Sequence, residues 1–124
     1  MKFVLAKEHL YWWPVTVDMP DPDKPGKWLK FSYTHQFVSV GNDEAIALQK
    51  EIAELKDDAE KAARQHDMLV KASRNWRDVV DEDKQEVPFS EEALRAALEH
   101  TWYRAGLYNA YFKSLTSDEA RKGN

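Results

Sequence analysis

The sequence predicts an α+β fold, in which an antiparallel β-hairpin or a short three-stranded sheet is followed by a mainly helical body. Residues 11–19 and 28–38 alternate apolar and polar side chains, which is the period of a half-buried strand. Residues 42–76 repeat apolar or small side chains at spacings of three and four, which is typical of an amphipathic helix. Ser90, followed by two glutamates, indicates the start of another helix.

Length and composition limit the classes of protein that fit. The 124 residues suffice for one domain but not for two independent cores, so we expect a single domain over 1–124. The net charge is −4 without a basic block, so no nucleic-acid partner is expected. Cysteine is absent, which suits a reducing cytoplasm and excludes disulfides and thiolate metal sites. No apolar run approaches the roughly 18 residues of a membrane span, and no signal peptide is recognisable, so no membrane partner is expected.

Residues 1–40 are predicted to form the sheet. Pro14 has no N–H to donate, so the first strand is expected at a sheet edge. A proline-rich loop, 20–27, leads to the second strand. A short third strand is expected at Lys2–Ala6. The hairpin has one aromatic face, and because a two-stranded hairpin is marginally stable alone, that face must pack on something.

Residues 42–76 are predicted to form a long middle helix with Asn42 as its N-cap. Unbroken, it would be about 50 Å long, which exceeds the width of a small domain. We therefore expect it either to project or to break, with the break near Gln65–Asp67. The seam of this helix either packs on the hairpin or meets another copy of the chain in a homo-oligomer. Its residues include Leu48, Ile52, Leu55, Ala59, Ala62 and Leu69.

Residues 79–115 are predicted to form an acidic turn and a C-terminal helix. The turn, 79–87, is expected to be a small hairpin or an extended loop. The helix is expected to begin at Ser90 and end near Leu115, with a kink or an interruption at His100–Thr101. Its predicted apolar stripe comprises Leu94, Leu98, Ala105, Tyr108, Phe112 and Leu115. The polar tail, 116–124, is expected to fray.

No catalytic or cofactor-binding pattern occurs, so we expect a protein that is not an enzyme. The four glycines are isolated and form no phosphate-binding loop. The acidic residues of 78–86 lack the spacing and the glycine of a calcium loop, so we expect a solvated turn and no metal. The histidines are scattered and are expected to be surface or packed residues; they are His9, His35, His66 and His100.

Aromatic side chains are the best candidates for protein contacts. The chain has five each of Trp, Tyr and Phe, too many to be fully buried in so small a domain. Trp12 falls on the strand face opposite Trp13, while Tyr103 and Tyr111 lie off the predicted helical stripe. We expect Trp12, Tyr103 and Tyr111 to be exposed anchors of an interface. The alternative is that each shields a crevice within the monomer.

The stretch Trp76–Leu115 resembles the tail assembly chaperones of long-tailed bacteriophages and prophages. It reads Trp76-Arg77-Asp78-Val79-Val80-Asp81-Glu82-Asp83, then Val87-Pro88-Phe89-Ser90, a helix with Leu94, and Trp102-Tyr103-Arg104-Ala105. The hairpin and charged helix before it, and Arg121-Lys122 and Asn124 after it, extend the resemblance. Lys84 departs from the pattern, because a glycine often follows the turn aspartate there. A different turn geometry is therefore expected.

The resemblance implies a role in phage assembly. Members of this family coat the tape measure protein, keep it soluble and help to recruit tail tube subunits. The implied partners are the tape measure protein, the tail tube protein and further copies of the chain. The implied location is the host bacterial cytoplasm, and not the mature virion. Two alternatives remain: a structural tail or head-completion component retained in the virion, and an acidic adaptor or inhibitor that binds a host factor.

Overall fold

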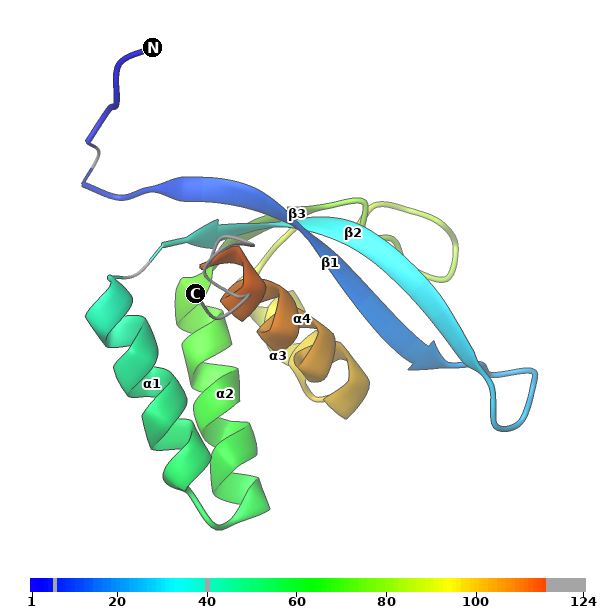
Figure 1. Cartoon of the computed structure of the whole chain (residues 1–124). Helices are drawn as coiled ribbons and strands as arrows, with labels where there is room; N and C mark the ends of the chain where they lie inside the picture. The colour runs from blue at the N-terminus through cyan, green and yellow to red at the C-terminus, as the bar shows by residue number, and fades with distance from the viewer. Residues whose placement is uncertain (6, 40, 116–124) are drawn as a thin grey trace.

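The predicted α+β fold is confirmed by a computed structural model, which describes residues 1–5, 7–39 and 41–115. Within these ranges a three-stranded antiparallel sheet is covered on one side by four helices (Figure 1). The predicted fraying of 116–124 lies outside the described residues. In chain order the elements are β1 (Leu10–Pro20), β2 (Trp28–Val38), α1 (Asn42–Glu54), α2 (Asp58–Ala72), β3 (Ser73–Arg77), α3 (Glu91–Leu98) and α4 (Thr101–Ser114).

The sheet has the strand order β1-β2-β3, so β1 lies at an edge, as Pro14 predicted. The hairpin register pairs Trp13 with His35 and Pro20 with Trp28. The third strand is not the one expected from the sequence. Residues 2–5 form no strand, and Ala6 lies outside the described residues; β3 pairs with β2 instead.

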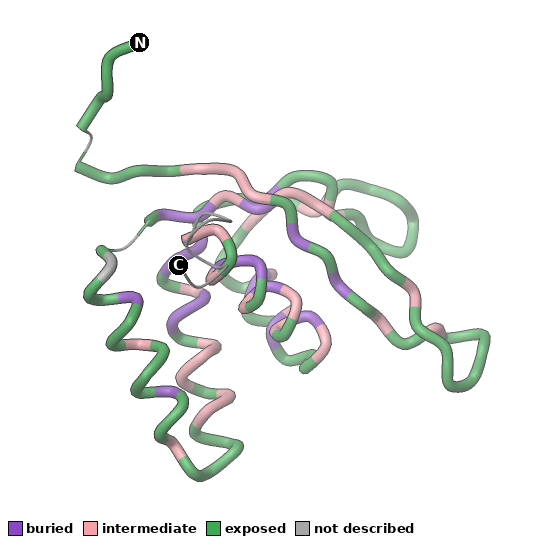
Figure 2. Tube along the Cα trace, viewed as in Figure 1, coloured by how far each residue is buried: buried purple, intermediate pink, exposed green. Residues whose placement is uncertain are grey.

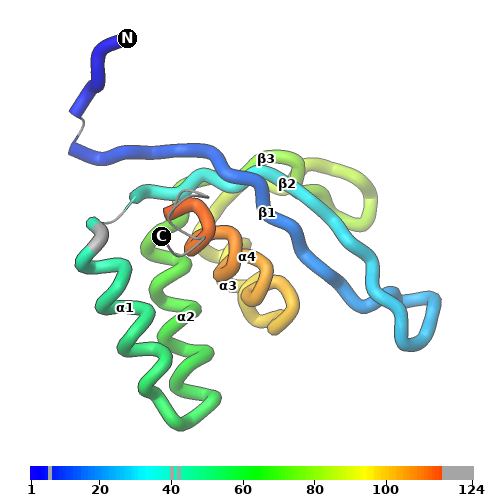
Figure 3. The backbone as a smooth tube through the Cα atoms, in the orientation of Figure 1, coloured from blue at the N-terminus to red at the C-terminus, as the bar shows by residue number. Residues whose placement is uncertain are grey.

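The long middle helix is broken into two antiparallel helices, α1 and α2 (Figure 3). The break lies at Leu55–Asp57, so the predicted position near Gln65–Asp67 is wrong. Leu55 adopts an extended conformation and ends α1, while the Asp57 side chain accepts a hydrogen bond from the Ala59 N–H and caps α2. Gly41, and not Asn42, is the N-cap of α1.

Residues 73–76 are in a strand and not in the predicted helix. Ser73 ends α2 in an extended conformation, and its Oγ donates a hydrogen bond of 2.7 Å to the Leu69 carbonyl oxygen. The chain then pairs with β2, which places Trp76 opposite His35. Pairing with a sheet thus overrides the helical spacing that the sequence continues through Trp76.

The acidic turn is a small hairpin, one of the two structures expected for it. Val80 and Glu86 form a bridge, and the Val87 N–H donates to the Val79 carbonyl oxygen at 2.9 Å. The Asp81 carboxylate accepts hydrogen bonds from two backbone N–H groups of the turn. Lys84 has a φ of 61°, the left-handed conformation that favours glycine. The Lys84 backbone therefore adopts a conformation that glycine adopts more readily, at some conformational cost.

The core lies between the inner face of the sheet and the helices (Figure 2). Its fully buried side chains include Val15, Phe37, Leu69, Leu94, Leu98 and Leu107. The helix predicted from Ser90 to Leu115 is interrupted at His100, which has an extended conformation and is the N-cap of α4. The interruption expected at His100–Thr101 is thus confirmed. It changes the helical phase, so the predicted stripe is correct in α3 and only partly correct after it, where Tyr108, Phe112 and Leu115 are half-buried against the core. There Ala105 is exposed, and the buried residues are Tyr103, Leu107, Ala110 and Tyr111.

Helix α4 approaches the edge strand closely at Gly106. A Cβ atom on this residue would lie 2.6 Å from the Thr16 carbonyl oxygen and 3.3 Å from a Val17 methyl group. Glycine is therefore required for backbone proximity, and not for an unusual φ angle. The contact sets the position of α4 along β1 and shapes the groove described below.

Candidate protein-interaction surfaces

Two of the three predicted contact residues are buried. Tyr103 is 8 % exposed and Tyr111 is 1 % exposed, so their expected exposure is wrong. The physical reason is the change of helical phase at His100, which turns both side chains toward the sheet. Tyr111 packs against Phe37 with ring centroids 5.0 Å apart. Neither tyrosine is available to a partner.

Trp12 lies at the surface, half-buried, on the face of the sheet opposite the helices. The Arg77 guanidinium carbon is 3.7 Å from the centroid of its ring, a cation–π contact. Thr16 and Ser32 face each other farther along the hairpin, with their hydroxyl oxygens 3.3 Å apart. This open sheet face thus carries both the Trp12–Arg77 pair and polar side chains.

The predicted helical seam is divided between α1 and α2, which pack on each other. Ile52 and Leu69 are buried, and Leu48 is half-buried against the core. Leu55 and Ala62 are half-buried, whereas Ala59 is exposed. For the buried seam residues, packing within the chain is therefore the correct interpretation, although α1 packs on a helix and not on the hairpin. Whether the chain forms a homo-oligomer through the exposed remainder stays a prediction.

A concave feature with a volume of about 910 Å³ runs between β1 and α4. We call it the aromatic groove because three tryptophans line it: Trp13, Trp28 and Trp102. Trp28 is 63 % exposed. The other lining residues are Pro14, Thr16, Asp18, Lys30, Ala105, Gly106, Asn109, Ala110 and Lys113. The sequence signal for this groove is a glycine inside a helix, which marks a close backbone approach.

The first five residues carry large apolar side chains that nothing in the described chain covers. Phe3 is 87 %, Val4 81 % and Leu5 87 % exposed. This N-terminal segment, Met1–Leu5, extends away from the body of the molecule beyond the start of β1 (Figures 1 and 2). The strand predicted at Lys2–Ala6 is wrong for residues 2–5, which pair with no other strand.

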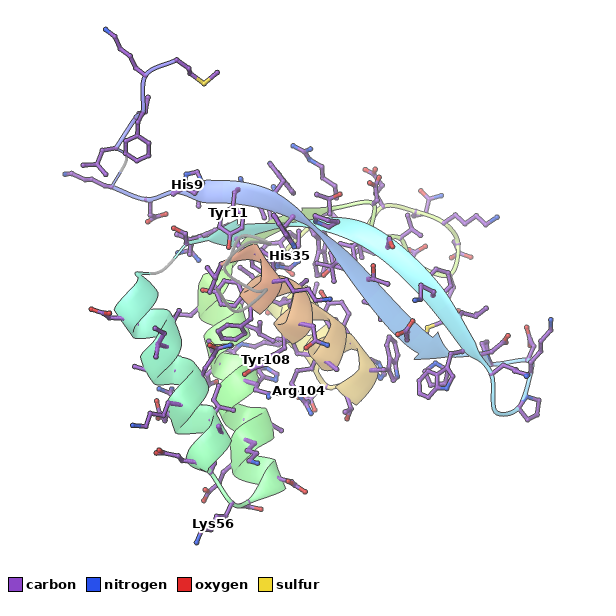
Figure 4. All side chains as sticks on the ribbon, in the orientation of Figure 1. His9, Tyr11, His35, Lys56, Arg104 and Tyr108 are labelled. Atoms are coloured by element: carbon purple, nitrogen blue, oxygen red, sulfur yellow. The ribbon has the colours of Figure 1, made fainter. Side chains whose placement is uncertain are left out.

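A chain of buried hydroxyl and imidazole groups connects the sheet to the helices. His35 is fully buried on β2, between the sheet and the helical layer (Figure 4). Its Nε2 atom lies 2.7 Å from Ser73 Oγ, and its Nδ1 atom lies 3.0 Å from the Tyr33 hydroxyl. The Tyr33 hydroxyl is in turn hydrogen-bonded to the Tyr103 hydroxyl of α4. Four elements, β2, α4, α2 and β3, are thereby joined.

The direction of these hydrogen bonds follows from the Ser73 hydroxyl, whose donor role is fixed. Ser73 Oγ donates its proton to the Leu69 carbonyl oxygen, so it accepts from His35 Nε2–H. His35 is then neutral, and its Nδ1 atom accepts from the Tyr33 hydroxyl, which accepts from Tyr103. Burial lowers the pKa of His35 to about 3 and raises the pKa of Tyr103 to about 12. These groups stay uncharged at neutral pH.

This polar chain is structural in character. His35 is enclosed and its tautomer is fixed, and the Ser73 hydroxyl beside it is buried and donates its proton to the Leu69 carbonyl oxygen. Within residues 1–5, 7–39 and 41–115, no group of three or more His, Cys, Asp or Glu side chains is placed to hold a metal ion. No helix in the same ranges has the length and apolar character needed to cross a membrane.

Comparisons with protein families, with curated proteins and with solved structures find no match to this chain.

Proposed function

We propose that this chain is a phage tail assembly chaperone, which binds the tape measure protein, keeps it soluble and helps to recruit tail tube subunits. The observation that carries the proposal is the resemblance of Trp76–Leu115 to that family. The structure adds a physical rationale, since the residues of this stretch contact one another and form a connected unit that includes α3 and α4.

The motif residues act as packing and capping groups. The Trp76 indole N–H donates to the Val87 carbonyl oxygen at 2.7 Å, and the Trp76 ring meets Phe89 edge-on with centroids 5.2 Å apart. Ser90 Oγ accepts from the Ala93 N–H at 3.0 Å and caps α3. These contacts join the acidic hairpin to the core, so the motif supports the fold of the family and leaves client binding to other residues.

The open sheet face suits an amphipathic helical client. Trp12 supplies a large apolar contact, and Arg77 beside it supplies a donor for a carboxylate. Tape measure proteins are long helical chains with apolar stripes that aggregate when uncovered. The net charge of −4 favours a soluble complex and disfavours phage DNA. Many weak contacts of this kind along one client would combine through multivalency.

Co-expression with the tape measure protein encoded in the same phage genome tests the proposal. We expect the wild-type chain to move the tape measure protein into the soluble fraction. Trp12→Ala is expected to weaken binding about 30-fold, as for an aromatic hot spot. Ile46→Ala, at an exposed apolar residue of α1, is the matched control and should bind normally.

Two outcomes would contradict the proposal. A tape measure protein that stays insoluble beside a folded wild-type chain would remove the chaperone function. Mass spectrometry that finds the chain at stoichiometric level in purified virions would favour a structural tail or head-completion component. An adaptor for a host factor would instead be recovered with that factor and without tail proteins.

A further inference from the structure

We propose that the N-terminal segment, Met1–Leu5, of one copy binds in the aromatic groove of a second copy of this chain. The proposal concerns self-association and does not depend on the proposed function. It rests on two unpartnered apolar surfaces in the same molecule, together with the limited reach of the segment within its own chain.

The segment has the character of a buried strand or peptide but lies in solvent. Phe3, Val4 and Leu5 are each more than four-fifths exposed. Three consecutive large apolar side chains at such exposure are unfavourable in water, and contiguous apolar surface of this kind marks sites of association. A partner that covers them is therefore expected.

The groove offers a complementary surface. Its tryptophans supply broad apolar walls, and Ala105 adds an exposed small residue of α4, whereas Gly106 already lies against the backbone of β1. Tryptophan is among the residues most enriched at interface hot spots. The rim carries Asp18 near the Trp28 end, which can pair with Lys2 of an incoming segment.

The segment cannot reach the Trp28 end of the groove in its own chain. The His9 carbonyl oxygen accepts from the Ser39 N–H at 2.9 Å, which fixes the chain just before β1. From there Phe3, six residues away, reaches at most about 21 Å. Trp28 pairs with Pro20 at the far end of β1, about 33 Å from Leu10 at about 3.3 Å per residue. Folding back within one chain would leave the Trp28 end of the groove empty.

A reciprocal exchange between two copies has the size of a stable interface. If each copy gives its segment to the other, the contact is closed and two-fold symmetric. Two five-residue segments, with the groove walls that they cover, bury on the order of 1,000 Å² or more, which reaches the range of specific interfaces. The rim charges are mixed, with Asp18 beside Lys30 and Lys113, so the association should depend little on salt.

Cysteine cross-linking is a direct test because the chain contains no native cysteine. In the full chain carrying Phe3→Cys and Lys30→Cys, oxidation should give a disulfide-linked dimer, seen by non-reducing electrophoresis and light scattering. The matched control carries Phe3→Cys and Val80→Cys, since Val80 is also exposed but lies on the acidic hairpin. A cross-link confined to one copy, or equal dimer yields from both pairs, would overturn the proposal.

Association of the variants without cross-links gives an independent measurement. We expect the wild-type chain to dimerise in sedimentation equilibrium, and Phe3→Asp or Trp28→Ser to raise the dissociation constant at least about tenfold. Both side chains are exposed, so circular dichroism should show an unchanged fold. Ile46→Asp should dimerise like the wild type. A wild-type chain that is monomeric at high concentration, or a dimer that tolerates both variants, would refute the exchange.

Discussion

Ser73 determines which ring nitrogen of His35 carries the proton. In the sequence His35 is one of four scattered histidines. Because the Ser73 hydroxyl is committed to the Leu69 carbonyl oxygen, His35 must donate from Nε2 and accept at Nδ1. A protonated ring would have two donors and no acceptor for the Tyr33 proton. Burial of the ring lowers the pKa of His35 to about 3, and the hydrogen-bond geometry suits the neutral form that results.

This buried histidine predicts acid sensitivity of the fold. The folded pKa of about 3 lies below the unfolded value of about 6.5. Between these values the unfolded chain takes up a proton that the folded chain does not. The free energy of unfolding should therefore be unaffected by His35 above pH 6.5 and should fall by up to about 1.4 kcal/mol per pH unit toward pH 3.

Urea unfolding across pH 3–8 measures the effect, with His35→Gln as the comparison. Glutamine can donate and accept hydrogen bonds but does not titrate, so its profile should be flatter by the histidine contribution. Carboxylates affect both proteins equally. Parallel profiles would mean that the buried histidine does not take part in the acid transition.

At the scale of elements, the sequence predicted helices and strands correctly where their pattern is local, and failed where a helix cap or the pairing of distant strands sets the structure. The hairpin was predictable because alternation and Pro14 report directly on a half-buried edge strand. The break between α1 and α2 was missed because a weak cap at Asp57 outweighed a continuous apolar spacing. β3 was missed because its strand conformation comes from pairing with β2, which no local signal in Ser73–Arg77 reveals.

The candidate surfaces were predicted less well for a related reason. Tyr103 and Tyr111 were placed outside because the predicted apolar stripe kept one helical phase from Leu94 to Leu115, across the interruption expected at His100–Thr101. An interruption of two residues rotates every later side chain by about 200°, at about 100° per residue. The aromatic groove depends on where α4 lies against β1, and therefore on tertiary structure that periodicity does not encode.

The close approach of α4 to β1 yields a prediction about Gly106. Helix propensity alone favours Gly106→Ala by about 1 kcal/mol. The added Cβ would, however, lie 2.6 Å from the Thr16 carbonyl oxygen, and such overpacking costs about 1–3 kcal/mol. We expect a net loss of about 1 kcal/mol in the free energy of unfolding, measured by denaturant titration.

Asn109→Ala on the same helix separates sterics from propensity. Asn109 is exposed, so its replacement should stabilise the protein by a few tenths of a kcal/mol. If Gly106→Ala also stabilises, the contact with Thr16 relaxes without cost and does not fix the position of α4.

At the scale of the whole molecule, stability is unevenly distributed. The sheet, α2, α3 and α4 share the core, whereas α1 packs chiefly on α2, and Ala45 and Ile52 are the buried residues among those of α1 whose burial is described. We expect α1 to open without global unfolding, with amide hydrogens that exchange at least about tenfold faster than those of α4. Hydrogen-exchange mass spectrometry measures this. Equal protection of both helices would show that α1 unfolds only with the whole domain.

The surfaces available to partners are distributed over this framework. The open sheet face carries Trp12, the aromatic groove follows the edge of β1, and the N-terminal segment leaves from the end of the sheet opposite the hairpin loop (Figure 1). Thr16 belongs both to the open sheet face and to the lining of the groove, so a client on that face and a second copy in the groove would be neighbours on one chain.

The Trp76–Val87 hydrogen bond has a consequence for how such proteins diversify. The residues that reveal the family resemblance are occupied with holding the acidic hairpin on the core. Two chains that share them would inherit a common architecture while each remained free to acquire a different client through its exposed positions. Under the proposed function, swapping the sheet face between two such chains, with the tryptophan and its hairpin left untouched, should transfer the preference for one tape measure protein to the other.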